Sequence, residues 1–176
     1  LQEAARRGLA NLTSTADALP AYTAEKNVAL FTRHGVFTRE EMAARQEIHM
    51  ENYCHMLSIE ANTMLDMLRR DILPAASAYA GALNRRALGR TSSSCRYENA
   101  TAARVSDRTD ALLAVCDKLE EDLKAAPGEA EARMTYFHGV VLEDMTAART
   151  LADQLETLVE RTFWPFPSYS DILFYM

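Results

Sequence analysis

Residues that interrupt helices are scarce in this sequence, which has only six glycines and five prolines among 176 residues. Alanine, leucine, glutamate, arginine and methionine dominate instead, and these are good helix formers. No apolar run approaches the ~20 residues of a membrane span, and no signal peptide opens the chain. The composition therefore predicts a helical protein without membrane contact, which we expect in the cytoplasm.

Positive charge and cysteine are also in short supply. With 19 Lys+Arg against 25 Asp+Glu, the formal net charge is −6. Binding to nucleic acid needs cationic side chains that displace counterions from phosphates, so we expect no nucleic-acid partner. Three widely separated cysteines predict free thiols in a reducing compartment: Cys54, Cys95 and Cys116.

Motifs that carry catalysis are missing as well. The sequence contains no Gly-x-Gly-x-x-Gly, Walker-type loop or Gly-x-Ser-x-Gly. None of the four histidines belongs to the Glu-x-x-His pair that a di-metal site in a helical bundle requires. Glu51 and His55 stand one helical turn apart beside Cys54, but a metal site needs more ligands than these. We therefore predict no catalytic, cofactor-binding or metal-binding residue in this chain.

Apolar residues recur at steps of three and four along three long stretches, which is the period of a helix face. The first stretch runs from Thr38 to about residue 87, and Pro74 is expected to kink it without ending it. A polar loop at 89–94 and the Pro127-Gly128 break separate it from the second and third stretches. Representative positions of the three faces are Cys54, Leu57, Ala61 and Leu68; Val105, Leu112, Cys116 and Leu119; and Phe137, Val141, Ala148 and Leu155.

The N-terminal region predicts one further helix, from Leu1 to about Leu19, ended by Pro20. A brief helix or turn is expected at 24–32, and Gly35 permits a sharp change of direction. Thr38-Arg39-Glu40-Glu41 fits a capping box at the start of the first long helix. The fold class predicted is all-α, an antiparallel bundle of three long helices plus an N-terminal helix.

The C-terminal tail differs from the rest of the chain. Residues 163–176 hold six aromatic side chains, including the only tryptophan, and two prolines that exclude a long helix. An apolar extended tail in water aggregates, so we expect it to dock on a surface. Its own bundle is favoured, and a neighbouring subunit or another domain is the alternative. The chain is then a single domain, 1–176, divided into 1–37, the bundle at 38–161 and the aromatic tail at 162–176.

Two stretches resemble a known family. Lys26 to Glu41, with the Arg45-Gln46-Glu47-Ile48 that follows, and the terminal Trp164 to Phe174 are similar to the C-terminal region of type III glutamine synthetases. The segments Ile59-Glu60-Ala61 and Ile72-Leu73-Pro74-Ala75 fit the same family.

The resemblance implies a parent enzyme that joins ammonia to glutamate with ATP and Mg²⁺, in a large ring-shaped oligomer. The resemblance implies that the catalytic barrel lies upstream. The chain also opens inside a helical pattern and without methionine, which suggests a fragment of a longer protein. The chain itself is then a non-catalytic structural, assembly or regulatory domain, with no cofactor of its own. Its partners are the catalytic domain of the same polypeptide and neighbouring subunits. The alternative is an autonomous helical interaction or scaffold module.

Nine residues are candidates for contact with another domain or subunit. The segment from Lys26 to Glu41 combines a basic turn with apolar anchors. The alternative to a contact role is that this segment is a loop that packs the chain into the first long helix. The candidates are Lys26, Phe31, Arg33, His34, Phe37, Trp164, Phe166, Tyr169 and Phe174.

Overall fold

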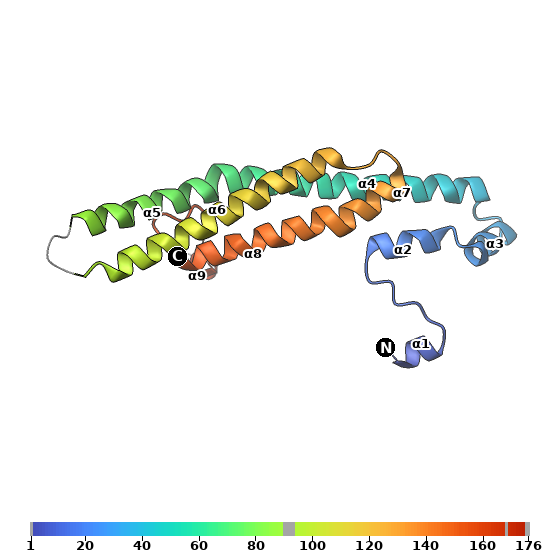
Figure 1. Cartoon of the computed structure of the whole chain (residues 1–176). Helices are drawn as coiled ribbons and strands as arrows, with labels where there is room; N and C mark the ends of the chain where they lie inside the picture. The colour runs from blue at the N-terminus through green and yellow to red at the C-terminus, as the bar shows by residue number, and fades with distance from the viewer. Residues whose placement is uncertain (1, 90–93, 168, 175–176) are drawn as a thin grey trace. The chain divides into compact units, whose positions relative to one another are not determined.

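The computed structural model describes residues 2–89, 94–167 and 169–174, and within these it contains helices and no strand (Figure 1). The predicted all-α class is therefore confirmed. The helices are α1 (Gln2–Arg6), α2 (Thr15–Tyr22), α3 (Glu25–Arg33), α4 (Arg39–Met67), the π-helix η1 (Leu68–Ile72), α5 (Leu73–Leu88), α6 (Arg96–Ala125), α7 (Ala130–Tyr136), the π-helix η2 (Phe137–Val141), α8 (Leu142–Leu158) and α9 (Tyr169–Leu173). Every helix in this part of the chain is too short or too polar for a transmembrane span.

The chain divides into two compact units, each described here by itself. Unit 1 comprises Leu1–Ile59 and Ala125–Val140, and unit 2 comprises Glu60–Lys124 and Val141–Met176. The predicted loop at 89–94 lies partly outside the described residues.

Unit 2 is built from three helical segments: the end of α4 with η1 and α5, then α6, then α8. Arg69 of η1 pairs with Asp117 late in α6 (Nη2–Oδ1 2.9 Å), whereas the Sγ of Cys95, just before α6, lies 3.5 Å from the carbonyl oxygen of Ala87. The start of the first segment thus meets the end of α6, and the end of the first segment meets the start of α6. The first segment and α6 therefore run antiparallel, as Figure 1 shows. The antiparallel bundle that the apolar period predicts is present here.

The core of unit 2 consists of the residues that recur at helical spacing. All are buried, and a fully buried leucine contributes about 1.5–3 kcal/mol relative to an exposed one. The core includes Ala61, Leu68, Ile72, Tyr79 and Leu83 of the first segment, Val105, Leu112, Cys116 and Leu119 of α6, and Ala148, Ala152 and Leu155 of α8.

The first long helix continues past Pro74, as the sequence analysis predicted. A π-helical turn before the proline makes this possible. The ring of a proline inside a helix clashes with the carbonyl four residues earlier, and the proline lacks an amide hydrogen. In η1 the amide of Leu73 donates to the carbonyl of Leu68, five residues back, so the turn before the proline is wider than an α-turn. The helical path continues through α5 to Leu88.

The predicted helix from 1 to 19 is wrong. α1 ends at Arg6, Gly8 adopts a left-handed φ of 73°, and α2 begins only after Ser14. Ser14 caps α2, since its hydroxyl accepts a hydrogen bond from the amide of Asp17 (3.0 Å). Pro20 lies inside α2 and does not end it. The brief helix expected at 24–32 is present as α3.

Candidate interaction site

The corner between α3 and α4 in unit 1 is held by local contacts. Gly35 adopts a φ of 65°, a left-handed conformation that strains other residues. The predicted capping box is confirmed, because the amide of Glu41 donates to the Thr38 hydroxyl (3.1 Å) and the Thr38 amide donates to the Glu41 carboxylate (2.8 Å). Arg39 pairs with Glu25 across the corner (2.7 Å).

The predicted contact residues of this corner fall into two groups. Phe31 and Phe37 are half-buried against each other, with ring centroids 5.8 Å apart, and the Arg45 guanidinium lies 4.5 Å from the Phe37 ring centroid. Both phenylalanines therefore pack the corner itself. Lys26, Arg33 and His34 are exposed. These three polar side chains are accessible to a partner, and so are Leu30 and Val36, which are 52% and 53% exposed.

The tail in unit 2 leaves α8 at Val159, where the backbone becomes extended, and its first aromatic residue anchors it. The ring centroid of Phe163 lies 5.4 Å from that of Tyr79, which is buried in α5. Burial first, and a hydrogen bond with Tyr97 second, raise the pKa of Tyr79 to about 12. Arg86 contacts Glu160 just before this point (3.4 Å). The start of the tail therefore packs on its own unit.

The rest of the tail is less covered. Trp164 and Phe166 are half-buried, non-helical backbone runs to Pro167, and α9 then begins at Tyr169. An ion pair between Arg161 and Asp171 joins the two ends of this segment. The side chain of Tyr169 lies outside the described residues. Ile172 and Leu173 at the end of α9 and Phe174 just after it are exposed apolar residues, and Phe174 is 75% exposed.

Another exposed apolar surface lies on α4, and the sequence analysis did not predict it. Ile48, Met56 and Ile59 are 53%, 57% and 48% exposed. They follow one another at steps of eight and three residues, so they share one face of the helix, opposite the buried Met50, Cys54 and Leu57. We call these three exposed residues the α4 apolar face.

An apolar groove between α2 and α4 of unit 1 adjoins this face at Met56. Its cavity volume is about 440 Å³, and it is lined by Thr15, Leu19, Tyr22, His49, Asn52, Tyr53 and Met56. Gln46 fastens one wall to the other, because its amide donates to the carbonyl of Leu19 (2.8 Å) and its oxygen accepts from the Thr23 hydroxyl (3.0 Å). The Tyr22 and His49 rings meet edge to face at 6.3 Å. The groove is thus a formed feature of unit 1.

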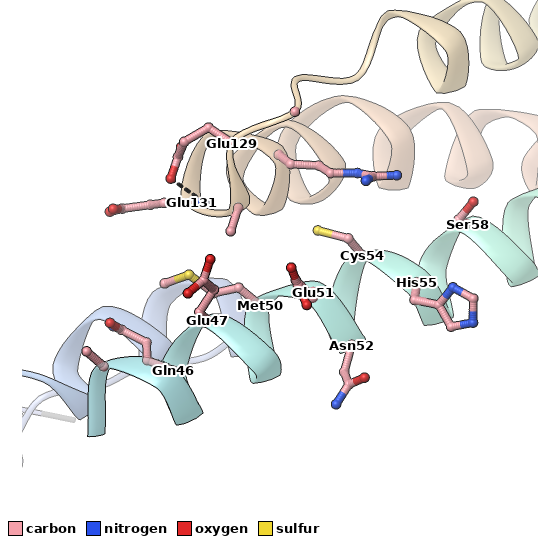
Figure 2. Close-up of a pocket in the computed structure, with 14 residues that line it drawn as sticks. Gln46, Glu47, Met50, Glu51, Asn52, Cys54, His55, Ser58, Glu129 and Glu131 are labelled. Carbon is pink, nitrogen blue, oxygen red and sulfur yellow. Dashed lines mark hydrogen bonds between the residues drawn. The ribbon is translucent and has the colours of Figure 1, made fainter. Parts of the chain in front are cut away.

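A polar cavity of about 720 Å³ lies between α4 and the start of α7, also in unit 1 (Figure 2). Its charged lining comes from Glu47, Glu51, Glu129, Glu131 and Arg133. The Glu129 carboxylate accepts hydrogen bonds from the amides of Ala132 (2.7 Å) and Glu131 (3.0 Å), and these bonds hold its pKa below the usual value. Glu129 is therefore occupied as the cap of α7.

The polar cavity does not gather the donors that a metal ion needs. Among the described residues, no three His, Cys, Asp or Glu side chains are grouped for a metal. In Figure 2, the His55 ring extends from the side of α4 away from α7, so it does not join Glu129 and Glu131. Cys54 is buried, and burial raises the pKa of its thiol, as it does for Cys116. Buried neutral thiols are poor nucleophiles.

Comparison with known proteins identifies the family. The family model described as "Glutamine synthetase C-terminal domain" matches residues 1–90. The chain belongs to the glutamine synthetase C-terminal domain family. Three relatives extend the similarity to nearly the whole chain: a glutamine synthetase of Butyrivibrio fibrisolvens (35% identical, 99% of this chain), a type-3 glutamine synthetase of Dictyostelium discoideum (30%, 96%) and a glutamine synthetase of Bacteroides fragilis (29%, 98%).

The chain spans about a quarter of the length of these relatives, namely 26%, 24% and 25%. A glutamine synthetase C-terminal domain is therefore one part of a much longer polypeptide in each of them. The resemblance found from Lys26–Glu41 and Trp164–Phe174 is confirmed at the level of the family.

Proposed function

We propose that this chain is the non-catalytic C-terminal domain of a type III glutamine synthetase, an enzyme that joins ammonia to glutamate with ATP and Mg²⁺. Its role is structural: it contacts the remaining polypeptide of the same subunit or of a neighbouring subunit. Catalysis, and the binding of ATP and metal, belong to that remaining polypeptide. The fit of the chain to only a quarter of each relative supports this division of labour.

The α4 apolar face is the observation that carries this proposal. Three large apolar side chains about half exposed on one helix face cost free energy in water and gain it when a partner covers them. The face belongs to unit 1, as do the exposed cations Lys26 and Arg33. Apolar side chains at the centre and charged side chains at the rim are typical of protein–protein contacts, and unit 1 exposes side chains of both kinds.

The experiment replaces Met56 and Ile59 with glutamate in the enzyme that carries this domain. Both side chains are exposed, so the thermal stability of the isolated chain should change by less than about 0.5 kcal/mol. Burying two unpaired carboxylates in a contact is costly, and we expect assembled, active enzyme to fall roughly tenfold or more at fixed subunit concentration. Sedimentation velocity and glutamine formation measure the two effects.

Leu113→Glu provides the matched control, because Leu113 is an exposed leucine on α6 of unit 2, outside the α4 apolar face. It should leave both assembly and activity near wild type. If the Met56/Ile59 variant assembles and works normally, the α4 apolar face is not the contact. If the isolated chain instead makes glutamine or binds Mg-ATP with micromolar affinity, the non-catalytic role is wrong. If the chain turns out not to be part of a longer polypeptide, the scaffold-module alternative is correct.

A further inference from the structure

Three charged side chains meet between α6 and α8 in unit 2. The Lys118 ammonium lies 2.9 Å from Asp122 Oδ2 on its own helix and 2.6 Å from Asp144 Oδ1 on α8. One lysine thus serves two carboxylates. We call Lys118, Asp122 and Asp144 the acid triad.

The members of the acid triad differ in their exposure. The side chain of Lys118 is 58% exposed, that of Asp122 is 22% exposed and that of Asp144 only 10%. Asp144 Oδ2 is buried without a hydrogen-bond partner among the described residues. An ionised carboxylate in this position loses hydration that one lysine contact only partly replaces, and a protonated carboxyl loses much less because it carries no charge.

The neighbouring charges act on Asp144 in opposite directions. Burial raises its pKa first, the hydrogen bond from Lys118 lowers it, and the Asp122 carboxyl raises it again, with a net shift above the usual value. The two carboxylates in turn raise the pKa of Lys118, which stays charged. Arg69, on the first helical segment of unit 2, forms ion pairs with Asp117 and Glu120. The described charged groups that shift the pKa of Asp144 are Lys118 and Asp122.

The acid triad also has a particular place along the chain. The chain leaves unit 2 after Lys124 and re-enters it at Val141, so residues 125–140 belong to unit 1. Asp122 precedes the exit by two residues, and Asp144 follows the re-entry by three. The triad therefore ties together the two ends of this excursion.

We propose that Asp144 takes up a proton beneath Lys118, and that the acid triad is a pH-sensitive latch between α6 and α8. With the proton present, one carboxylate balances one ammonium and the helices are fastened. With the proton lost, two carboxylates face a single ammonium, and the excess charge loosens the contact between α6 and α8.

The sign of the pH effect follows from the direction of the Asp144 shift. Because the folded chain holds this proton more tightly than the unfolded chain, the triad stabilises the fold at low pH. This stabilisation is lost as pH rises through the folded pKa of Asp144. A latch made of ordinary surface ion pairs has the opposite behaviour, since acid weakens it.

Carboxyl-carbon NMR on the 176-residue chain tests the proposal directly. Asp144 should titrate above the ordinary aspartate value of about 3.9, and Asp122→Asn should move its midpoint down by about one pH unit. Asp153→Asn is the control, because Asp153 lies on the same helix but pairs with exposed Arg149. It should leave the Asp144 midpoint unchanged.

Thermal unfolding between pH 4 and 8 gives a second readout. Asp144→Asn removes the titrating group, so the variant should melt about 2–4 °C above wild type at pH 8 and approach it at pH 4. The proposal is overturned if Asp144 titrates at or below the ordinary value, or if Asp122→Asn leaves its midpoint in place. The NMR measurement on the wild-type chain decides the matter even if Asp144→Asn does not fold.

Discussion

The two units of the chain join their helices with different chemistry. In unit 2, ion pairs cross between the three helical segments, through Arg69 and Asp117, Lys118 and Asp144, and Arg86 and Glu160. Unit 1 has one such ion pair, Arg39 with Glu25 between α3 and α4, and otherwise uses hydrogen bonds: Gln46 bonds to Thr23 and to the Leu19 carbonyl, and the Tyr53 hydroxyl lies 3.3 Å from His138 Nδ1.

This difference predicts that the units respond to different conditions. Exposed ion pairs are weakened by salt and contribute little each, typically 0–1 kcal/mol. Neutral hydrogen bonds contribute about 1 kcal/mol each and are insensitive to salt. The stability of unit 2 should therefore depend on ionic strength and pH. The stability of unit 1 should depend more on individual polar side chains.

The largest expected effects come from the two cores. Phe137 of unit 1 is 1% exposed and Leu112 of unit 2 is 0% exposed. Phe137→Ala should cost about 3–5 kcal/mol and Leu112→Ala about 2–5 kcal/mol, through lost burial and a cavity. Hydrogen exchange should quicken first in the unit that carries the change. Equal acceleration in both units would mean that they unfold as one.

The tail offers the next comparison, between its anchored and its exposed aromatic residues. Phe163→Ala removes the contact with Tyr79 and should cost about 1–3 kcal/mol in chemical denaturation of the isolated chain. Phe174→Ala should change stability by less than about 0.5 kcal/mol, since this side chain is 75% exposed. If both substitutions cost the same, the tail docks along its whole length.

A smaller pair of effects separates the polar chemistry of the units. Gln46→Ala removes two hydrogen bonds from unit 1 and should cost about 1–2 kcal/mol at any salt concentration. Arg69→Ala should cost about 0–1 kcal/mol in 50 mM salt and nothing measurable in 1 M salt. A strong salt dependence for Gln46→Ala, or none for Arg69→Ala, would contradict the comparison.

Much of the fold could be predicted because its determinants are local. The steps of three and four through Val105, Leu112 and Cys116 specify a helix face, and the same residues are buried. The Thr38–Glu41 capping box is readable from four consecutive residues. The N-terminal prediction failed because the apolar period was continued across Gly8, although Ser14 carries a cap signal of its own.

The candidate surfaces were harder to predict, because they depend on what the fold leaves uncovered. The apolar period placed Cys54 and Leu57 on the buried face, but it did not mark Ile48, Met56 and Ile59 as an exposed apolar surface on the opposite side. The acid triad depends on the register between α6 and α8, which brings Lys118 to Asp144 across 26 residues. Lys26 and Arg33 of the predicted basic turn are exposed, and their role in a contact stays a prediction.

The proposal that a partner covers the α4 apolar face is tested most directly by labelling a cysteine placed on it. Met56→Cys should react rapidly with a maleimide in the isolated chain, as its 57% exposure requires. In the full-length enzyme the same cysteine should react at least roughly tenfold more slowly, while Leu113→Cys reacts equally in both. Peptide mass spectrometry distinguishes these sites from the native half-buried Cys95. Equal reactivity of Met56→Cys in the isolated chain and the full-length enzyme would show that nothing covers the face.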